Sequence, residues 1–421
     1  MSAPNPILLK QPWLRAPQTR AVMAALTAAG GEDCARFVGG CVRNALMGYA
    51  VDDVDIATRL TPAEVIVALE AARLKAVPTG VDYGTVTAVA SGRPFEITTL
   101  RRDVETDGRR AVVAFTTDWS EDAGRRDFRL NALYADAAGV LFDPTGQGMA
   151  DALAGRIVFV GDAATRITED ALRILRFFRF QAWYGRGEPD AAALSACARM
   201  KTRITQLSAE RIAKEMLKLL ATPDPRAVLR LMVETGVMGE ISPGFAGPLT
   251  ALDQLVEIEI HASVPCDPLL RLAALLPDAG AVGALRLRLS NAQRDRLVAA
   301  LTVFPADPRD ESGVMRADLT PREARRLIYR LGADVFQDRL LLAWAASDAR
   351  DAAPWSALLS LARTWPRPTF PLTGADALAA GVAKGPQVGA LLREVEVWWI
   401  DQDFNADRGA LEARLRAAAG G

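Results

Sequence analysis

The hydrophobic pattern changes near residue 162, and this change restricts the chain to a mixed first part followed by helices alone. Upstream, short apolar runs bounded by turn residues are typical of strands. These runs cover Arg36–Val38, Val54–Ala57, Thr85–Ala90, Phe95–Leu100 and Leu133–Ala135. Downstream, stretches rich in Ala, Leu and Arg at helical spacing continue almost to the C-terminus, broken by proline-containing turns. The pattern predicts an α+β protein: an N-terminal head with a small mixed β-sheet and helices, followed by an all-helical remainder.

The length of 421 residues corresponds to two to four domains of roughly 100–200 residues each. From the change in pattern we predict a head over residues 1–150, a helical neck over residues 151–225 and a helical body over residues 226–421. Within the head, the stretch Pro62–Arg73 is a predicted helix with Thr61 as its N-cap.

The residue inventory excludes several kinds of catalytic site. His261 is the single histidine, which rules out clusters of histidine ligands and Ser-His-Asp catalysis. The four cysteines are scattered without a CxxC pair, which argues against a zinc site or a disulfide framework. Any metal chemistry must therefore depend on carboxylates.

The charge balance and the N-terminus set further limits. The net charge is −1, so a surface for a polyanion must be local. Such an excess of basic residues occurs between residues 161 and 230. The N-terminal residues MSAPNPILLKQPW lack the charged and apolar regions of a signal peptide, and no apolar run reaches about 20 residues. We therefore expect a cytoplasmic protein without a membrane span.

A glycine pair between a predicted strand and a predicted helix forms the first candidate binding feature. Gly39 and Gly40 let the backbone approach a bound group closely, and the N-terminus of the following helix offers N–H donors to a phosphate. Arg43 lies in the first turn of that helix and can pair with the same anion.

Two aspartates follow this turn at a spacing that suits metal binding. Asp53 and Asp55 are two residues apart on the next predicted strand, so we expect both side chains on one face of it. Two like charges at such a short distance repel each other unless a cation lies between them. Mg²⁺ uses one or two carboxylates together with substrate phosphates. Asp52 is expected on the opposite face.

A second constellation lies on a predicted helix over Glu169–Phe180. Asp170 and Arg173 are at positions i and i+3, so they are expected on the same face. A carboxylate beside a guanidinium presents acceptors and donors suited to the Watson–Crick edge of a base. Arg176 and Arg179 continue the same stripe and can pair with phosphate.

Six segments in a fixed order resemble one known family, the class II tRNA nucleotidyltransferases and bacterial poly(A) polymerases of the DNA polymerase beta superfamily. GGCVRN…DDVDIAT resembles its catalytic signature, and EITTLRRDVETDGRR (Glu96–Arg110) resembles its flexible loop. EDAGRRDFRLNALYAD, DPTGQGMAD, EDALRILRFFRF and ERIAKEMLKLL resemble its later head, hinge and neck motifs. The resemblance covers roughly residues 30–220.

The resemblance implies a CCA-adding enzyme that transfers CMP, CMP and AMP from CTP and ATP to the tRNA 3′ end. It implies Asp53 and Asp55 as the catalytic ligands of two Mg²⁺ ions. It implies nucleotide binding by Gly39, Gly40, Arg43, Arg126, Asp170, Arg173, Arg176 and Arg179. It further implies that Asp127 and Asn131 support the ribose and the local fold, with Glu96 as a candidate third acidic residue. The helical body is then the expected tRNA-binding part.

Three alternatives stay open. A bacterial poly(A) polymerase shares the head and neck, although Pro78–Val89 looks more like the CCA-adding version. An enzyme that adds only CC or only A is a second alternative, and the long segment Leu100–Asp118 argues against the CC-only type. A catalytically inactive RNA-binding scaffold would be expected to have lost Asp53 or Asp55, and both are present.

Two positions depart from the pattern of the family. Asn44 stands where an aspartate is usual, and Tyr83 stands where a histidine is common. Neither is among the expected metal ligands.

Overall fold

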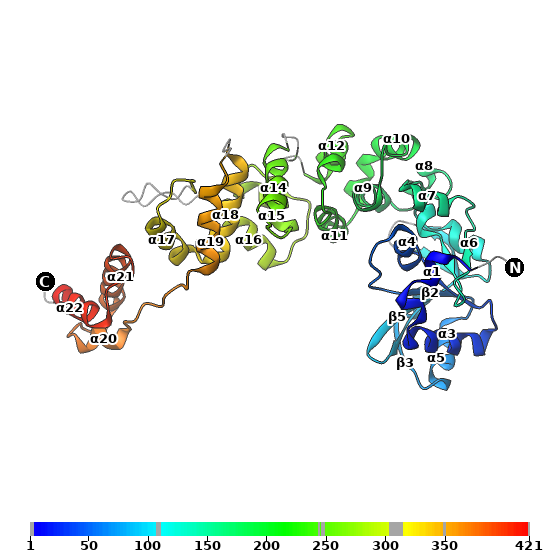
Figure 1. The fold of residues 1–421 in the computed structure, drawn as a ribbon, viewed down its shortest axis with the longest axis horizontal. Helices are drawn as coiled ribbons and strands as arrows, with labels where there is room; N and C mark the ends of the chain where they lie inside the picture. Colours follow the sequence, from blue (N-terminus) through cyan, green and yellow to red (C-terminus); the bar gives the residue numbers. More distant parts are fainter. Residues whose placement is uncertain are drawn as a thin grey trace. The chain divides into compact units, whose positions relative to one another are not determined.

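A computed structural model describes the protein over residues 4–106, 111–242, 245, 249–302, 315–347 and 351–419. The chain divides into two compact units (Figure 1). Unit 1 comprises Met1–Ala246 with Arg286–Arg288, and unit 2 comprises Gly247–Leu285 with Leu289–Gly421. Among the described residues, no helix combines the length and the apolar character that crossing a membrane requires.

Unit 1 contains a mixed seven-stranded sheet with the order β3-β4-β5-β2-β1-β8-β9. Its strands are β1 (Ala35–Val38), β2 (Asp55–Thr58), β3 (Lys75–Gly80), β4 (Thr85–Ala90), β5 (Arg93–Thr99), β8 (Tyr134–Ala135) and β9 (Leu141–Phe142). β2 and β5 run parallel, and every other neighbouring pair is antiparallel. The predicted fold class, α+β with a small mixed sheet in the head, is confirmed.

Two helices cover one face of this sheet, and both pack on β4 (Figure 1). They are α3 (Pro17–Gly30) and α5 (Pro62–Ala71). β4 alternates between half-buried and fully buried positions, which is typical of a strand with one face on a core. The predicted N-cap is confirmed: Thr61 and Glu64 form a capping box at the start of α5.

The other elements of the head are short. The helices are α1 (Pro6–Leu9), α2 (Pro12–Arg15), α4 (Gly40–Met47), α6 (Trp119–Gly124) and α7 (Gly148–Ala154), with 3-10 turns η1 (Val81–Tyr83) and η2 (Arg129–Asn131). A separate two-stranded sheet pairs β6 (Arg101–Thr106) with β7 (Ala111–Phe115). The resemblance to the flexible loop of the family extends over residues 107–110, which lie outside the described residues.

Helices make up the rest of unit 1. They are α8 (Ala163–Glu169), α9 (Leu172–Tyr184), α10 (Ala191–Arg199), η3 (Lys201–Gln206), α11 (Ala209–Leu220), α12 (Arg226–Glu234) and α13 (Val237–Ile241). The prediction of one helix over Glu169–Phe180 is wrong. α8 ends at Glu169, Asp170 has extended backbone angles of φ −150° and ψ 107°, and α9 begins at Leu172. The side chain of Asp170 accepts a hydrogen bond from the Leu172 amide at 3.0 Å, which stabilises this break.

The regular elements among the described residues of unit 2 are all helices. Its helices are α14 (Thr250–His261), α15 (Pro268–Ala273), η5 (Ala279–Ala284), α16 (Asn291–Leu301), α17 (Pro321–Leu331), α18 (Ala333–Ala346), α19 (Ala353–Thr364), α20 (Gly374–Ala379), α21 (Pro386–Asp401) and α22 (Arg408–Ala419). The prediction of helices alone after the head is confirmed for this part of the chain.

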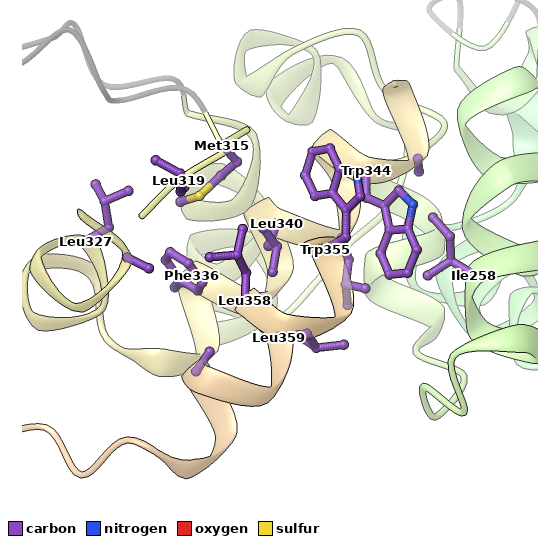
Figure 2. Packing of buried hydrophobic residues seen from close by; sticks show 14 of the residues in the cluster. Ile258, Met315, Leu319, Leu327, Phe336, Leu340, Trp344, Trp355, Leu358 and Leu359 are labelled. Carbon is purple, nitrogen blue, oxygen red and sulfur yellow. The ribbon is translucent and has the colours of Figure 1, made fainter. Parts of the chain in front are cut away.

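The larger apolar core of unit 2 lies between α14, α17, α18 and α19 (Figure 2). Phe336 and Leu340 from α18 are fully buried there. Trp344 and Trp355 stack with ring centroids 6.0 Å apart and an interplanar angle of 3°. A second apolar cluster joins Tyr329 of α17 to α20, α21 and α22. The helices of unit 2 are thus held by packing of their apolar faces.

The predicted strand at the paired aspartates begins one residue too early. Val54 lies outside β2, which starts at Asp55, and Asp53 precedes the strand in an exposed position. The strand prediction also missed β3, whose Pro78 is typical of an edge position, the pair β6 and β7, and the two-residue strand β9.

Candidate functional site

The glycine turn lies where β1 ends and α4 begins. Gly39 has φ 67° and ψ −118°, a conformation that side chains with a Cβ rarely adopt. Its amide donates to the Leu133 carbonyl at 3.1 Å, which ties the turn to the neighbouring chain segment. Since Gly40 is the first residue of α4, the unpaired N–H groups of the helix N-terminus begin here, as predicted for an anion site.

Arg43 is buried against the turn and bonded to neutral groups. Its Nη1 donates to Asn131 Oδ1 at 2.5 Å, and its Nη2 donates to Asn44 Oδ1 at 2.7 Å and to the Tyr184 hydroxyl at 2.8 Å. A Cβ added at Gly40 would lie 3.9 Å from Nη2. Burial lowers the pKa of Arg43, because its direct hydrogen-bond partners are neutral and the nearby Asp127 carboxylate offsets the burial only in part. This arrangement favours an anion at the turn.

Carboxylates gather at the start of β2. Asp55 is the register partner of Glu96 in the parallel pair β2–β5. Burial raises the pKa of Asp55 to about 6, with further contributions from the charges of Glu96 and Asp53. Like charges this close are relieved by a cation. Among the described residues, no group of three or more His, Cys, Asp or Glu side chains could hold a metal ion on its own.

Arg126 lies between the turn and these carboxylates. Its Nη1 would be 3.6 Å from a Cβ placed at Gly39, and its charge acts on Asp55. Its Nε and Nη2 donate to Asp122 Oδ2 at 3.2 and 2.9 Å. Tyr134 donates to the same carboxylate oxygen at 2.7 Å. Asp122 therefore fixes the orientation of Arg126 and leaves Nη1 directed at the turn.

A buried carboxylate connects the head to α9. Asp127 accepts hydrogen bonds from Arg176 Nε at 2.8 Å and from Asn131 Nδ2 at 2.9 Å. Burial opposes ionisation of Asp127, but Arg176 and the two hydrogen-bond donors Asn131 and Phe128 N lower its pKa to about 2. Since Asn131 also binds Arg43, the ionised carboxylate stabilises both arginines.

Farther along α9, Arg179 donates to Glu215 of α11 at 2.6 Å. Arg176 lies 4.0 Å from the same carboxylate group. The two arginines of the predicted stripe are therefore held by carboxylates of the head and of α11.

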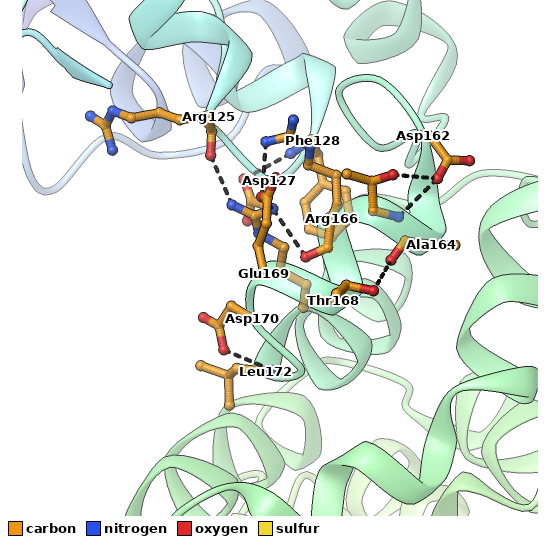
Figure 3. Close-up of polar contacts among 12 residues, drawn as sticks. Arg125, Asp127, Phe128, Asp162, Ala164, Arg166, Thr168, Glu169, Asp170 and Leu172 are labelled. Atoms are coloured by element: carbon orange, nitrogen blue, oxygen red, sulfur yellow. Dashed lines mark hydrogen bonds and ion pairs between the residues drawn. The ribbon is translucent and has the colours of Figure 1, made fainter. Parts of the chain in front are cut away.

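Asp170 and Arg173 have separate partners. Figure 3 shows Asp170 at the break, where its carboxylate accepts the hydrogen bond from the Leu172 amide. Asp170 pairs with Arg211 of α11 at 2.7 Å. Arg173 Nη1 donates to Glu169 at 2.6 Å, and its Nη2 donates to the Arg125 carbonyl at 2.8 Å. Asp170 thus lies in the break between α8 and α9 and Arg173 in the first turn of α9, rather than both on one face of a continuous helix.

Sequence reasoning missed several residues that shape the site. Asp122 was readable from its spacing, because it lies three and four residues before Arg125 and Arg126. Tyr184 could not be found this way, because it is 141 positions away from Arg43.

Comparisons with known proteins place this architecture in a family. Residues 35–158 match the poly A polymerase head domain, and residues 188–247 match the probable RNA and SrmB-binding site of polymerase A. The mouse protein named CCA tRNA nucleotidyltransferase 1, mitochondrial, is 32% identical over 387 residues, which cover 90% of this chain and 86% of the relative. The chain belongs to the CCA tRNA nucleotidyltransferase family. The predicted family is thereby confirmed.

Further members of the CCA tRNA nucleotidyltransferase family agree with this assignment. The CCA-adding enzyme of Streptococcus gordonii is 39% identical over 243 residues, 56% of this chain and 58% of the relative. The fold matches the Bacillus stearothermophilus CCA-adding enzyme in complex with CTP, with a TM-score of 0.70, 24% identity and coverage of 96% of this chain and 98% of that one. It also matches the Thermotoga maritima CCA-adding enzyme complexed with tRNA, with a TM-score of 0.67, 18% identity and coverage of 98% and 97%.

Proposed function

We propose that this chain adds CMP, CMP and AMP in turn to the 3′ end of tRNA, using CTP and ATP and releasing pyrophosphate. One observation carries the proposal: a glycine turn, two differently held arginines and a carboxylate cluster meet where β1 ends and β2 begins. The names of the relatives agree with the same activity. The three predicted parts then have distinct roles: residues 1–150 catalyse, residues 151–225 select the nucleotide and residues 226–421 bind tRNA.

The carboxylate chemistry fits divalent ions. Asp53 and Asp55 would hold Mg²⁺ together with substrate phosphates, and Glu96 is the adjacent acidic group. Bound there, Mg²⁺ supplies a lower pKa for the attacking 3′-hydroxyl and charge stabilisation for the departing oxygen. The pKa of Asp55 is raised first by burial and then by the charges of Glu96 and Asp53, and a bound cation would oppose all three effects.

The residues of the chain bind and orient the triphosphate. The backbone at Gly39 and Gly40 lets the phosphates approach closely, and the N-terminus of α4 donates N–H groups to them. Arg126 Nη1 points toward Gly39, and Arg43 adds positive charge behind Gly40. These groups hold charge in place before the reaction, as stabilisation of a phosphoryl transition state requires.

The base is read at the break between α8 and α9. Asp170 offers a carboxylate and Arg173 offers a guanidinium, whose partners Arg211 and Glu169 set their orientations. We propose that this pair recognises the Watson–Crick edge of cytosine or adenine. Arg176 and Arg179 supply positive charge farther along α9.

The basic neck and the helical body bind the acceptor end of tRNA by shape and backbone contacts in this proposal. The cytoplasm is the proposed compartment. The relatives from mouse, zebrafish and human carry mitochondrial in their names, so the compartment is tested by fractionation of cells that produce the protein.

The test is incubation of the purified protein with Mg²⁺, tRNA lacking its 3′ CCA, and each nucleotide singly and together. Growth by C, C and A followed by arrest supports the proposal. Long A tails on unrelated RNA favour polyadenylation, addition of only CC or only A indicates a partial enzyme, and no growth favours an inactive scaffold. Asp53→Asn should abolish growth, whereas the matched change Asp52→Asn, in the adjacent exposed carboxylate, should retain it.

A further inference from the structure

The last residue of α9 reaches across to the first turn of α4. The Tyr184 hydroxyl accepts a hydrogen bond from Arg43 Nη2 at 2.8 Å. The guanidinium carbon of Arg43 also lies 4.1 Å from the centroid of the Tyr184 ring. One side chain thus provides Arg43 with both a hydrogen-bond acceptor and an aromatic face.

Tyr184 is itself held from two sides, independently of Arg43. Its ring packs edge-on against Tyr49 at a centroid distance of 5.3 Å and lies 5.5 Å from the ring of Phe180. The Tyr49 hydroxyl donates to the Trp183 carbonyl at 3.2 Å. Tyr49 directly follows Gly48, the left-handed cap that ends α4. This contact therefore joins the C-terminal end of α9 to the residue that follows the C-cap of α4.

Fixing the guanidinium has an energetic consequence for a ligand. A free arginine side chain loses rotamer entropy when it binds an anion, and that loss weakens affinity. In this protein Arg43 is 7% exposed and already bonded by Asn44, Asn131 and Tyr184. Its Nη2, which Tyr184 holds, is the atom that lies beside Gly40. The rotamer entropy of the Arg43 side chain is therefore lost when the protein folds rather than when the nucleotide binds.

We propose that Tyr184 is a positioning residue for Arg43, so that affinity for the nucleotide triphosphate depends on the final residue of α9. The inference rests on the proposed function and deepens it. The triphosphate is common to CTP and ATP, so Tyr184 affects affinity for both nucleotides by the same factor. A residue that acted by shifting the base-reading part of α9 would instead change the ratio between the two.

The test is Tyr184→Phe, which keeps the ring and removes the hydroxyl. Dissociation constants for CTP and ATP with Mg²⁺ are measured by calorimetry, and kcat and KM by extension of tRNA ending in C or in CC. Loss of a hydrogen bond to a charged group predicts about tenfold weaker binding of both nucleotides, with kcat within about twofold of the unmodified protein. The ratio of the CTP and ATP constants should stay unchanged.

The matched control is Tyr49→Phe, which removes a hydroxyl from the same aromatic pair without touching Arg43. It should leave both dissociation constants unaltered. In an Arg43→Ala background, Tyr184→Phe should have no further effect, because the group through which it acts is gone. Melting temperatures of all variants verify that they are folded.

Four results would overturn the inference: unchanged affinity in Tyr184→Phe, an altered CTP-to-ATP ratio, equal losses with and without Arg43, or the same loss in Tyr49→Phe. If the unmodified protein extends tRNA, each of these results contradicts the role of Tyr184 and leaves the proposed function intact. An unmodified protein that neither binds CTP nor extends tRNA would defeat the proposed function together with this inference.

Discussion

Arg43 in unit 1 and Arg271 in unit 2 are both buried guanidinium groups, with 7% and 1% exposure, yet their surroundings differ. Arg271 Nε and Nη2 both donate to Glu259 Oε2, at 2.8 and 2.6 Å. Arg43 donates to two amides and a hydroxyl. A buried cation bonded directly to a carboxylate has its charge satisfied within the fold, whereas Arg43, which meets Asp127 only through Asn131, has more of its charge left for a ligand. The comparison separates charges that support the fold from charges that support a reaction.

The largest expected effect is in the carboxylate cluster of unit 1. Asp55→Asn should lower nucleotide addition on the order of 1000-fold, because losing about 4 kcal/mol of transition-state stabilisation corresponds to that factor. Its thermal stability should stay the same or rise, since burial and the neighbouring carboxylates disfavour the charge of Asp55. Single-turnover extension and calorimetric unfolding measure the two quantities. A large loss of stability would show that the charge of Asp55 stabilises the fold, and it would contradict the distinction drawn between Arg43 and Arg271.

Arg271→Met should have the opposite effect to Asp55→Asn: it should lower the stability of the protein without changing the KM for CTP. Glu259 would be left buried without its partner, which predicts a loss of about 3–5 kcal/mol in the free energy of unfolding. The double variant with Glu259→Met should recover most of that loss, because both charges are then absent. Denaturant unfolding measures stability, and the KM for CTP should not change in the folded fraction. A changed KM with unchanged stability would reverse the assignment of this pair.

Asp127→Asn should reveal the pH dependence of the buried network in unit 1. Asp127 has its pKa lowered from 3.8 to about 2, so its contribution is present above pH 4 and is lost as pH falls toward 2. The shift corresponds to roughly 2 kcal/mol. The stability difference between the unmodified protein and the variant should therefore be largest at neutral pH and narrow below pH 4. A difference independent of pH would show that ionisation of Asp127 does not stabilise the fold.

The smallest expected effect is at two matched helix caps, one in each unit. Thr61 with Glu64 and Thr320 with Glu323 form capping boxes, each followed by proline at the first helical position. Thr61→Ala and Thr320→Ala should each cost about 1 kcal/mol in the free energy of unfolding. Similar losses would show that local helix chemistry is the same in both units and that the difference lies in the buried charges. A loss confined to one unit would contradict this.

Features fixed by neighbouring residues could be predicted from the sequence. The glycine turn, the N-cap Thr61 and the strand Thr85–Ala90 depend on local conformation or on alternation over a few positions. The break at Asp170 was missed because helical spacing continues across it, while the side chain stabilises an extended backbone locally. Strand β3 was missed because its proline and polar residues suit an edge strand.

The pairing between charged side chains within the site could not be predicted from the sequence. Arg176 binds a carboxylate 49 positions away, and Arg211 binds one 41 positions away. Such pairs depend on how α9 and α11 pack, and a single sequence offers several acidic candidates for each arginine. The residue types of the site were therefore predictable, whereas the pairing of Asp170 with Arg211 rather than Arg173 was not.

Because the chain breaks between α8 and α9, the two proposed base-reading side chains, Asp170 and Arg173, are not held equally firmly. Arg173 belongs to a helix whose later turns are anchored by Asp127 and Glu215. Asp170 lies outside either helix in an extended conformation, and its Oδ2 is held by the half-buried Arg211. In the proposed mode of base reading, rotation of the Asp170 carboxylate alone would accommodate the exchange of cytosine for adenine, while Arg173 stays fixed on α9.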